Sequence, residues 1–206
     1  MTLYCATGNA GKLREFRLAA ETSGIQVEEL PALAAMTPCE ETGATFEANA
    51  ILKARYYGRQ APGRLFADDS GLEVDALGGA PGVYSARFAG RNATDEANNR
   101  LLLEKLAGVG ERTARFVCVI ALVEGTKVLR TFRGAVEGRI LEEPRGAHGF
   151  GYDPLFYYPP FACSFGEAAP ERKLTVSHRG AALGAMFRWL ASGKIESQRS
   201  DYISPD

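Results

Sequence analysis

Two adjacent carboxylates, Asp68 and Asp69, are the residues whose type and spacing point most directly to chemistry. A short apolar run at residues 65–67 stops at them, a pattern that predicts a strand delivering acids to the rim of a site. Because side chains alternate along a strand, one acid is expected to enter a cleft and the other to turn away. The chain continues with further polar residues and acids: Ser70, Gly71, Glu73 and Asp75.

Carboxylate oxygens gathered at a turn suit Mg²⁺, which is held by few protein oxygens and keeps room for water and phosphate. These acids therefore indicate a magnesium site. The alternative interpretation is a solvated acidic loop, which a lone Asp-Asp pair would favour. The choice between a magnesium site and a solvated loop depends on motifs elsewhere in the chain.

The turn at residues 7–11, followed by Lys12 at an expected helix start, is a candidate phosphate site. Backbone N–H groups and the positive helix end would face the ligand there. The turn is not a P-loop, since Ala6 and Leu13 stand where that motif needs a glycine and a hydroxyl. It is not the dinucleotide-binding fingerprint either, because two residues rather than one separate its glycines. The alternative is an ordinary strand-to-helix turn.

Two loops each carry one of the two histidines, His148 and His178. Ser177, His178 and Arg179 stand at an expected helix start, where they could grip an oxyanion or a base edge. Residues 149–153 offer aromatic faces, backbone amides and one carboxylate, which suits a heterocycle. Structural roles are the alternative for each. A Ser-His-Asp hydrolase is less well supported, because the G-x-S-x-G turn is absent.

The composition narrows the class of protein. The chain has 206 residues, 46% of them hydrophobic, and a formal net charge of −1, so no broad basic field exists for a nucleic acid. Four scattered cysteines form no C-x-x-C pair, which favours a reduced, cytoplasmic setting. No run approaches the roughly 20 apolar residues that span a bilayer. No signal-peptide pattern opens the chain, and neither a nucleic-acid nor a membrane partner is expected.

The order of elements predicts an α/β fold with a mixed sheet. Helices are expected at residues 12–22, 45–58 and 93–107 and from Ser177, and strands at residues 3–6, 25–30, 116–123, 127–136 and 155–158. Residues 1–193 would form one domain, followed by a polar tail at 194–206.

Two helical faces bear on the site. In the first helix Glu15 lies off the apolar stripe. In the second, Asn49 and Lys53 lie at the edge of the apolar face. They could point into a cleft, or Lys53 could extend to water past its apolar stem. The pattern favours neither alternative.

Six short segments, in order, resemble the Ham1 (RdgB) family of inosine/xanthosine triphosphate pyrophosphatases. They run from near residue 3 to about residue 190 and comprise residues 7–12, 40–50, 67–72, 78–87, 149–154 and 177–180. Each segment alone is weak evidence for the resemblance, whereas six of them in the same order are highly specific for the family.

The resemblance implies Mg²⁺-dependent hydrolysis of non-standard purine nucleoside triphosphates (ITP, dITP and XTP) to monophosphate and pyrophosphate. It implies an elongated mixed sheet flanked by helices, with two lobes around a central cleft, and a homodimer. Asp69 would be the proton acceptor or a metal ligand, and Glu40 a second ligand, with Glu41 the alternative. The triphosphate would be held by Thr7, Gly8, Asn9, Ala10, Gly11 and Lys12. The nucleotide would also contact Ser70, Phe150, Gly151, Tyr152, Asp153, Lys173, His178 and Arg179.

Two other functions remain open at this point. One is a non-catalytic nucleotide-binding regulator, which would gain nothing from the acidic set unless a metal intervened. The other is a pyrophosphatase that acts on modified pyrimidines, which a substrate profile would separate.

Overall fold

Seven strands form one mixed sheet in the order β2-β1-β3-β4-β5-β6-β7. The computed structural model describes residues 1–193, and the predicted tail lies outside them. β1 is parallel to β2 and β3, and the remaining neighbours pair antiparallel. The strands are β1 (Thr2–Cys5), β2 (Gln26–Glu29), β3 (Leu65–Val74), β4 (Thr113–Glu124), β5 (Lys127–Ile140), β6 (Phe156–Tyr158) and β7 (Cys163–Ser164). The predicted mixed α/β fold is confirmed.

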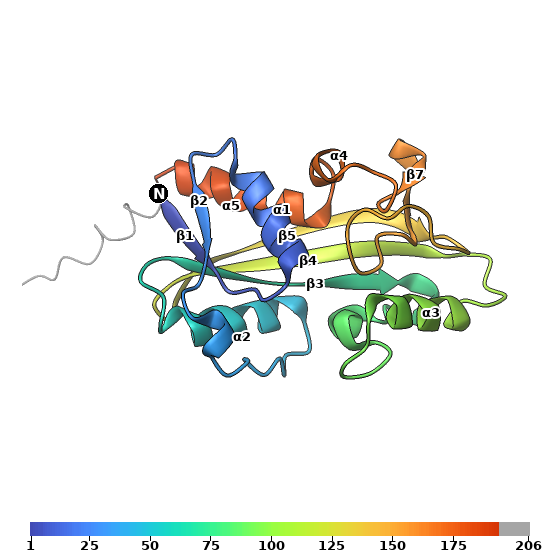
Figure 1. Cartoon of the computed structure of the whole chain (residues 1–206), viewed down its shortest axis with the longest axis horizontal. Coiled ribbons are helices and arrows are strands. Elements are labelled where there is room, and N and C mark those ends of the chain that lie inside the picture. The colour runs from blue at the N-terminus through green and yellow to red at the C-terminus, as the bar shows by residue number, and fades with distance from the viewer. Residues whose placement is uncertain (194–206) are drawn as a thin grey trace, which may run out of the picture.

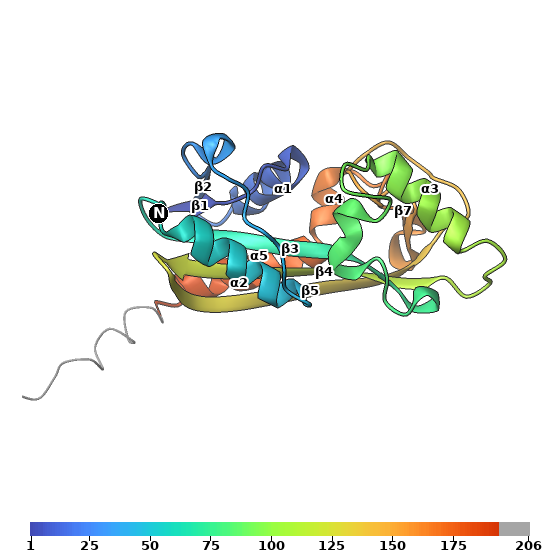
Figure 2. The ribbon, with the colours of Figure 1, turned by 90° about the horizontal axis from the view of Figure 1, so that it is seen from below.

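Helices cover both faces of this elongated sheet (Figure 1). One face carries α1 (Ala10–Ala20), α4 (Pro170–Leu174) and α5 (His178–Ala191). The other carries α2 (Phe46–Gly58) and α3 (Asp95–Lys105), which Figure 2 shows toward opposite ends of that face. Four short 3₁₀ turns complete the described chain: η1 (Leu33–Ala35), η2 (Asp75–Leu77), η3 (Gly82–Arg87) and η4 (Pro159–Phe161).

Capping residues start the helices as the sequence predicts. Thr45 Oγ1 accepts a hydrogen bond of 3.1 Å from the Ala48 amide, and Ser177 Oγ accepts one of 3.1 Å from the Gly180 amide. The first helix begins at Ala10 rather than Lys12, because Asn9 Oδ1 caps it by accepting from the Lys12 amide. The last residues of the turn after β1, Ala10 and Gly11, therefore belong to the first turn of the helix.

The prediction that a strand ends at Asp68 and Asp69 is wrong. β3 continues to Val74, paired residue by residue with β4 from Leu65 to Val74. The low strand propensity of Asp-Asp-Ser-Gly is overridden by this long antiparallel ladder. The acids therefore lie within a strand instead of at its end.

β1 is much shorter than β3, and this difference makes room for a site. The parallel register between them ends at Cys5 and Phe66, after which the chain turns into α1. Beyond Phe66 no strand within residues 1–193 pairs with this edge of β3, and only an isolated bridge joins Glu73 to Pro81. Side chains from both faces of β3 can thus reach one space beside the open edge.

Two further expectations concern composition. All four cysteines are free thiols. Within residues 1–193, none of the helices has the length and apolar character needed to cross a membrane.

Candidate active site

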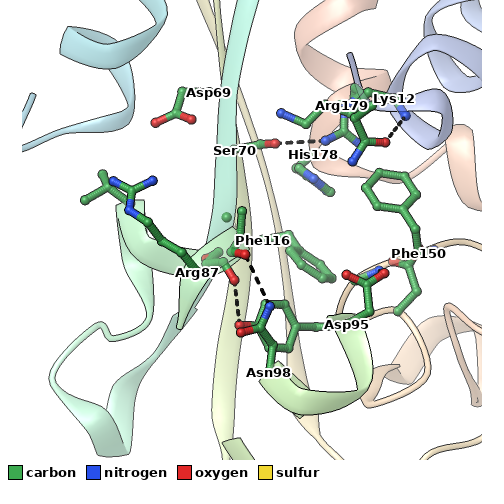
Figure 3. A pocket seen from close by; sticks show the side chains of 18 of the residues that line it. Lys12, Asp69, Ser70, Arg87, Asp95, Asn98, Phe116, Phe150, His178 and Arg179 are labelled. Carbon is green, nitrogen blue, oxygen red and sulfur yellow. Dashed lines mark hydrogen bonds between the residues drawn. The ribbon is translucent and has the colours of Figure 1, made fainter. Parts of the chain in front are cut away.

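A pocket lies beside the open edge of β3 (Figure 3). Its walls come from β3, the first turns of α1 and α5, η3, the start of α3, and the loop at residues 149–153. Segments from most of the chain thus meet at one place.

Asp69 faces α2 and is held by two of its side chains. Asp69 Oδ1 lies 3.1 Å from Lys53 Nζ, and Asp69 Oδ2 accepts a hydrogen bond of 3.1 Å from Asn49 Nδ2. Lys53 Nζ also lies 3.2 Å from Glu41 Oε1. Lys53 therefore points into the pocket rather than past the apolar face to water. Burial raises the pKa of Asp69, with Glu41 adding to the rise and Lys53 opposing it.

Asp68 faces the opposite side of the sheet, as strand alternation predicts. Its Oδ2 lies 2.9 Å from Lys12 Nζ and 3.7 Å from Arg179 Nη2. Burial alone would raise the pKa of Asp68, but the charges of Lys12 and Arg179 prevail and lower it to about 2. Asp68 is therefore an ionised anchor that holds two cations at the pocket.

A buried chain of alternating charges continues from Arg179 beneath the pocket. Glu15 pairs with Arg179 through one carboxylate oxygen, and its other oxygen lies 2.8 Å from Lys173 Nζ. Lys173 Nζ in turn lies 2.5 Å from Asp153 Oδ2. Glu15 lies off the apolar stripe in the sequence pattern, which favours an exposed side chain, yet in the structure it is only 9% exposed. It is buried as the partner of two cations that also line the pocket.

The turn after β1 contributes Asn9 and Lys12 to the lining. The other four residues predicted to hold the triphosphate do not line the pocket: Thr7, Gly8, Ala10 and Gly11. Thr7 Oγ1 accepts a hydrogen bond from the Asn9 amide at 3.2 Å. A Cβ at Gly11 would collide with the Phe150 ring, so the absence of a side chain lets the loop carrying Phe150 pack on α1.

Aromatic side chains form the side of the pocket opposite Asp69. Phe150 is labelled there in Figure 3, and the His178 ring stacks on Phe116 with centroids 4.8 Å apart. His178 is buried, and both burial and the nearby charges of Arg179 and Lys173 hold its pKa well below the usual range. These effects disfavour the protonated form of His178. The second histidine, His148, is exposed and lies outside this pocket.

Helix α3 connects two parts of the pocket wall. Asp95 Oδ2 accepts a hydrogen bond of 2.6 Å from the Gly151 amide, and Asn99 Nδ2 donates one of 3.0 Å to the Gly151 carbonyl. Asn98 lies between them in sequence and bonds instead to the η3 segment. Its Oδ1 accepts from the Ala89 amide at 2.8 Å, and its Nδ2 donates to the Ala86 carbonyl at 3.4 Å.

Most of the predicted site residues line this one pocket: Asn9, Lys12, Asp69, Ser70, Phe150, Gly151, Tyr152, Asp153, Lys173, His178 and Arg179. Of the two alternative acids, Glu41 lines the pocket, whereas Glu40 is exposed and does not. Sequence reasoning assigned no role to Glu15, Arg87, Asp95 or Asn98. Only Arg87 carried a signal, because it closes one of the segments that resemble the Ham1 family.

The chain is similar to known proteins along nearly its whole length. The model of the Ham1 family matches residues 3–189. A protein of Acidobacterium capsulatum named dITP/XTP pyrophosphatase is 49% identical over 196 residues, covering 91% of this chain and 97% of that protein. One of the same name from Thermus thermophilus is 48% identical, covering 94% and 93%.

Solved structures show the same fold. The Ham1 protein of Staphylococcus aureus superposes with a TM-score of 0.82 at 40% identity, covering 93% of this chain and 99% of that one. The HAM1 protein of Coxiella burnetii gives 0.83, with the same identity and coverage. With a family match along nearly its whole length and relatives close to half identical, this chain belongs to the Ham1 family.

Proposed function

We propose that this protein hydrolyses non-standard purine nucleoside triphosphates (ITP, dITP and XTP) to the monophosphate and pyrophosphate. Removal of these nucleotides would keep them out of DNA and RNA. The observation that carries the proposal is the convergence of Asp69, Glu41 and Lys53 in one pocket that also holds Lys12 and a buried aromatic wall. The names of the relatives support the same reaction.

Phosphate groups would be held at the start of α1. The positive end of the helix dipole lies at this turn, and Lys12, which lines the pocket beside Asn9, adds a positive charge. Asp68 fixes the Lys12 ammonium at 2.9 Å, so the cation is in place before a ligand enters. Charge that develops on departing pyrophosphate would be stabilised by these preorganised groups.

Asp69 would orient an attacking water and accept its proton. Burial raises its pKa, which makes it a better proton acceptor than an exposed aspartate where it binds the water and not the metal. Asn49 and Lys53 hold both of its oxygens, so the carboxylate is fixed in direction.

The acids of the pocket fit a magnesium ion. Asp69 and Glu41 both approach the single ammonium of Lys53, so their oxygens already converge on one cation. Within residues 1–193 no group of three or more His, Cys, Asp or Glu side chains is placed to hold a metal alone. Mg²⁺ commonly takes one or two carboxylates and completes its shell with phosphate oxygens and water. We assign Asp69 and Glu41, rather than Glu40, as its ligands, and the bound ion would neutralise phosphate charge.

The aromatic side would select the base. Hypoxanthine and xanthine present a 6-keto acceptor where adenine has an amino donor, and both lack the 2-amino group of guanine. The imidazole of His178, which lines the pocket, can donate to that oxygen. Adenine would leave this donor unpaired in a buried site, which makes its binding unfavourable.

Product analysis tests the reaction directly. Phosphate and pyrophosphate release would be measured with ITP, XTP, ATP, GTP and dTTP, in Mg²⁺ and in EDTA. We expect pyrophosphate from ITP and XTP alone, and none in EDTA. Orthophosphate would place the attack at the γ-phosphorus and overturn the mechanism. Cleavage of pyrimidine nucleotides, or binding without any product, would replace the proposal with one of its two rivals.

Lys12→Ala is expected to weaken triphosphate binding about tenfold or more, because a charge-assisted contact to phosphate is lost. Calorimetry with a non-hydrolysable ITP analogue measures this. Arg14→Ala is the matched control, since Arg14 is exposed on the same helix and outside the pocket. Equal affinities for wild type and Lys12→Ala would rule out the phosphate role of this turn.

We also propose a homodimer in the cytoplasm. Leu52 on α2 and Tyr84 on η3 are large apolar side chains that are 39% and 60% exposed, and they are candidates for contact with a second copy. Sedimentation equilibrium decides this, and a monomer at micromolar concentration would contradict it. The four free thiols support a reducing compartment.

A further inference from the structure

Arg87 is a pocket cation for which neither the sequence nor the proposed reaction has supplied a role. It ends η3 and lines the pocket, and Figure 3 shows it on the side of Asp69, away from Phe150. We propose that Arg87 is a substrate-binding residue that contacts phosphate oxygens of the nucleotide. This assignment rests on the proposed function for the identity of the ligand.

The first argument is that the other lining cations are already neutralised from within. Each has a carboxylate within ion-pair distance: Lys12 with Asp68, Lys53 with Asp69 and Glu41, Lys173 with Glu15 and Asp153, and Arg179 with Glu15 and Asp68. A triphosphate must compete with these carboxylates for each of those cations. Their net charge is therefore only partly available to an incoming anion.

Arg87 differs from these cations. Among the described residues it forms no ion pair, and its guanidinium lies 5.1 Å from the centre of the Tyr84 ring. Tyr84 is 60% exposed and does not itself line the pocket. An unpaired guanidinium can bind two phosphate oxygens at once without giving up a carboxylate. Its full charge is available to the ligand.

The second argument is that the backbone carrying Arg87 is fixed on every side. Ser85 Oγ accepts from the Leu72 amide at 2.9 Å and donates to the Gly82 carbonyl at 2.6 Å. The Tyr152 hydroxyl donates to the Ser85 carbonyl at 2.8 Å. A Cβ at Gly71 would collide with Ser85 Oγ and the Gly82 carbonyl, so η3 packs directly on the β3 backbone.

These contacts hold η3 to β3 and to the aromatic loop, and Asn98 adds the two bonds from α3. All of them are made by Ser85, Ala86, Ala89 or their partners, and none uses the Arg87 guanidinium. The backbone of η3 is thus held in place, while the long Arg87 side chain at the pocket has no ion-pair partner among the described residues. That arrangement suits a group that orders around an anionic ligand.

The test measures binding of the phosphate part and of the base part of the nucleotide separately. Affinities for pyrophosphate and for inosine would be measured by equilibrium binding, and KM and kcat for ITP by pyrophosphate release. We expect Arg87→Gln to weaken pyrophosphate binding and raise KM for ITP by roughly tenfold to a hundredfold, because charge-assisted bonds are lost. Inosine affinity should not change. Arg87→Lys should recover part of the loss, since it restores charge without the bidentate fork.

Arg91→Gln is the matched control, because Arg91 is exposed in the loop that follows η3 and does not line the pocket. It should behave as wild type. Unchanged pyrophosphate affinity in Arg87→Gln would overturn the assignment, as would an equal loss of inosine affinity, which indicates a collapsed wall. If wild type binds pyrophosphate through Arg87 yet cleaves no purine triphosphate, the proposed reaction fails while the anion site holds.

Discussion

Asp69→Asn is expected to abolish turnover of ITP while leaving the protein folded. The substitution keeps the size of the side chain but removes the charge that we propose accepts a proton and faces the metal. Loss of a general base alone costs about 10²–10⁴-fold in rate, and loss of a metal-facing carboxylate adds to this. We therefore expect a fall in kcat on the order of 10³-fold or more, measured as pyrophosphate release under saturating ITP.

The fold should survive because the Asn side chain keeps one of its two present contacts. An amide oxygen can still accept from Lys53, which lies 3.1 Å from Asp69 Oδ1, although the bond from Asn49 is lost. One lost hydrogen bond costs about 1 kcal/mol. Circular dichroism and a thermal melt would verify this, and a variant that does not fold would make the rate uninformative about chemistry.

Asp75→Asn is the matched control for that experiment. Asp75 lies just after β3, is exposed, and pairs at 2.9 Å with Arg115 outside the pocket. The same chemical change there should leave kcat within about twofold, since exposed ion pairs contribute little. A near-wild-type rate in Asp69→Asn would exclude Asp69 as proton acceptor and as an essential ligand.

The second large effect is expected on stability, from Glu15→Ala. Glu15 holds both Lys173 and Arg179, which are almost completely buried. Removing one partner of a buried ion pair leaves uncompensated charge and costs about 3–5 kcal/mol of unfolding free energy. For a protein of this size the melting temperature should fall by on the order of 10 °C. Urea unfolding gives the free energy directly.

Glu21→Ala controls for the loss of a carboxylate from the same helix, because Glu21 is exposed at the end of α1. It should change stability by less than about 0.5 kcal/mol. Equal stability of wild type and Glu15→Ala would show that the buried charges are compensated without Glu15.

The effect of Glu15→Ala should depend on pH in one direction. Burial pushes the pKa of Glu15 up, but the charges of Arg179 and Lys173 outweigh it, so the folded-state pKa lies below the ordinary 4.5. A lowered pKa means that the stabilisation is complete above the ordinary value and is lost as the pH falls through the folded-state value. The difference in unfolding free energy between wild type and variant should therefore shrink under acid conditions. A difference that grows on acidification would contradict the ion-pair origin.

Periodicity and capping were sufficient to predict the main helices and the central hairpin. Thr45 and Ser177 cap where expected, and strand alternation placed Asp68 and Asp69 on opposite faces. These features are local, so a short window of sequence contains the physics that decides them.

Long-range partners explain what the sequence could not predict. Glu15 is buried only because Lys173 and Arg179, 158 and 164 positions away, fold onto it. β3 runs through Asp68 and Asp69 because β4 pairs with it along its whole length. The short elements β7 and α4 were missed, since they have too few residues to show a period.

Helix α3 has a consequence for how this pocket can change over evolution. Asn98 and Asn99 are neighbours in sequence but point about 100° apart around the helix, so one bonds to Ala86 of η3 and the other to Gly151. A single rigid rod therefore sets the span between the wall beside Arg87 and the loop that carries Phe150. A substitution that shifts α3 moves both at once. If Phe150 selects the base and Arg87 binds the phosphates, as we propose, a change in α3 alters base preference and phosphate affinity together.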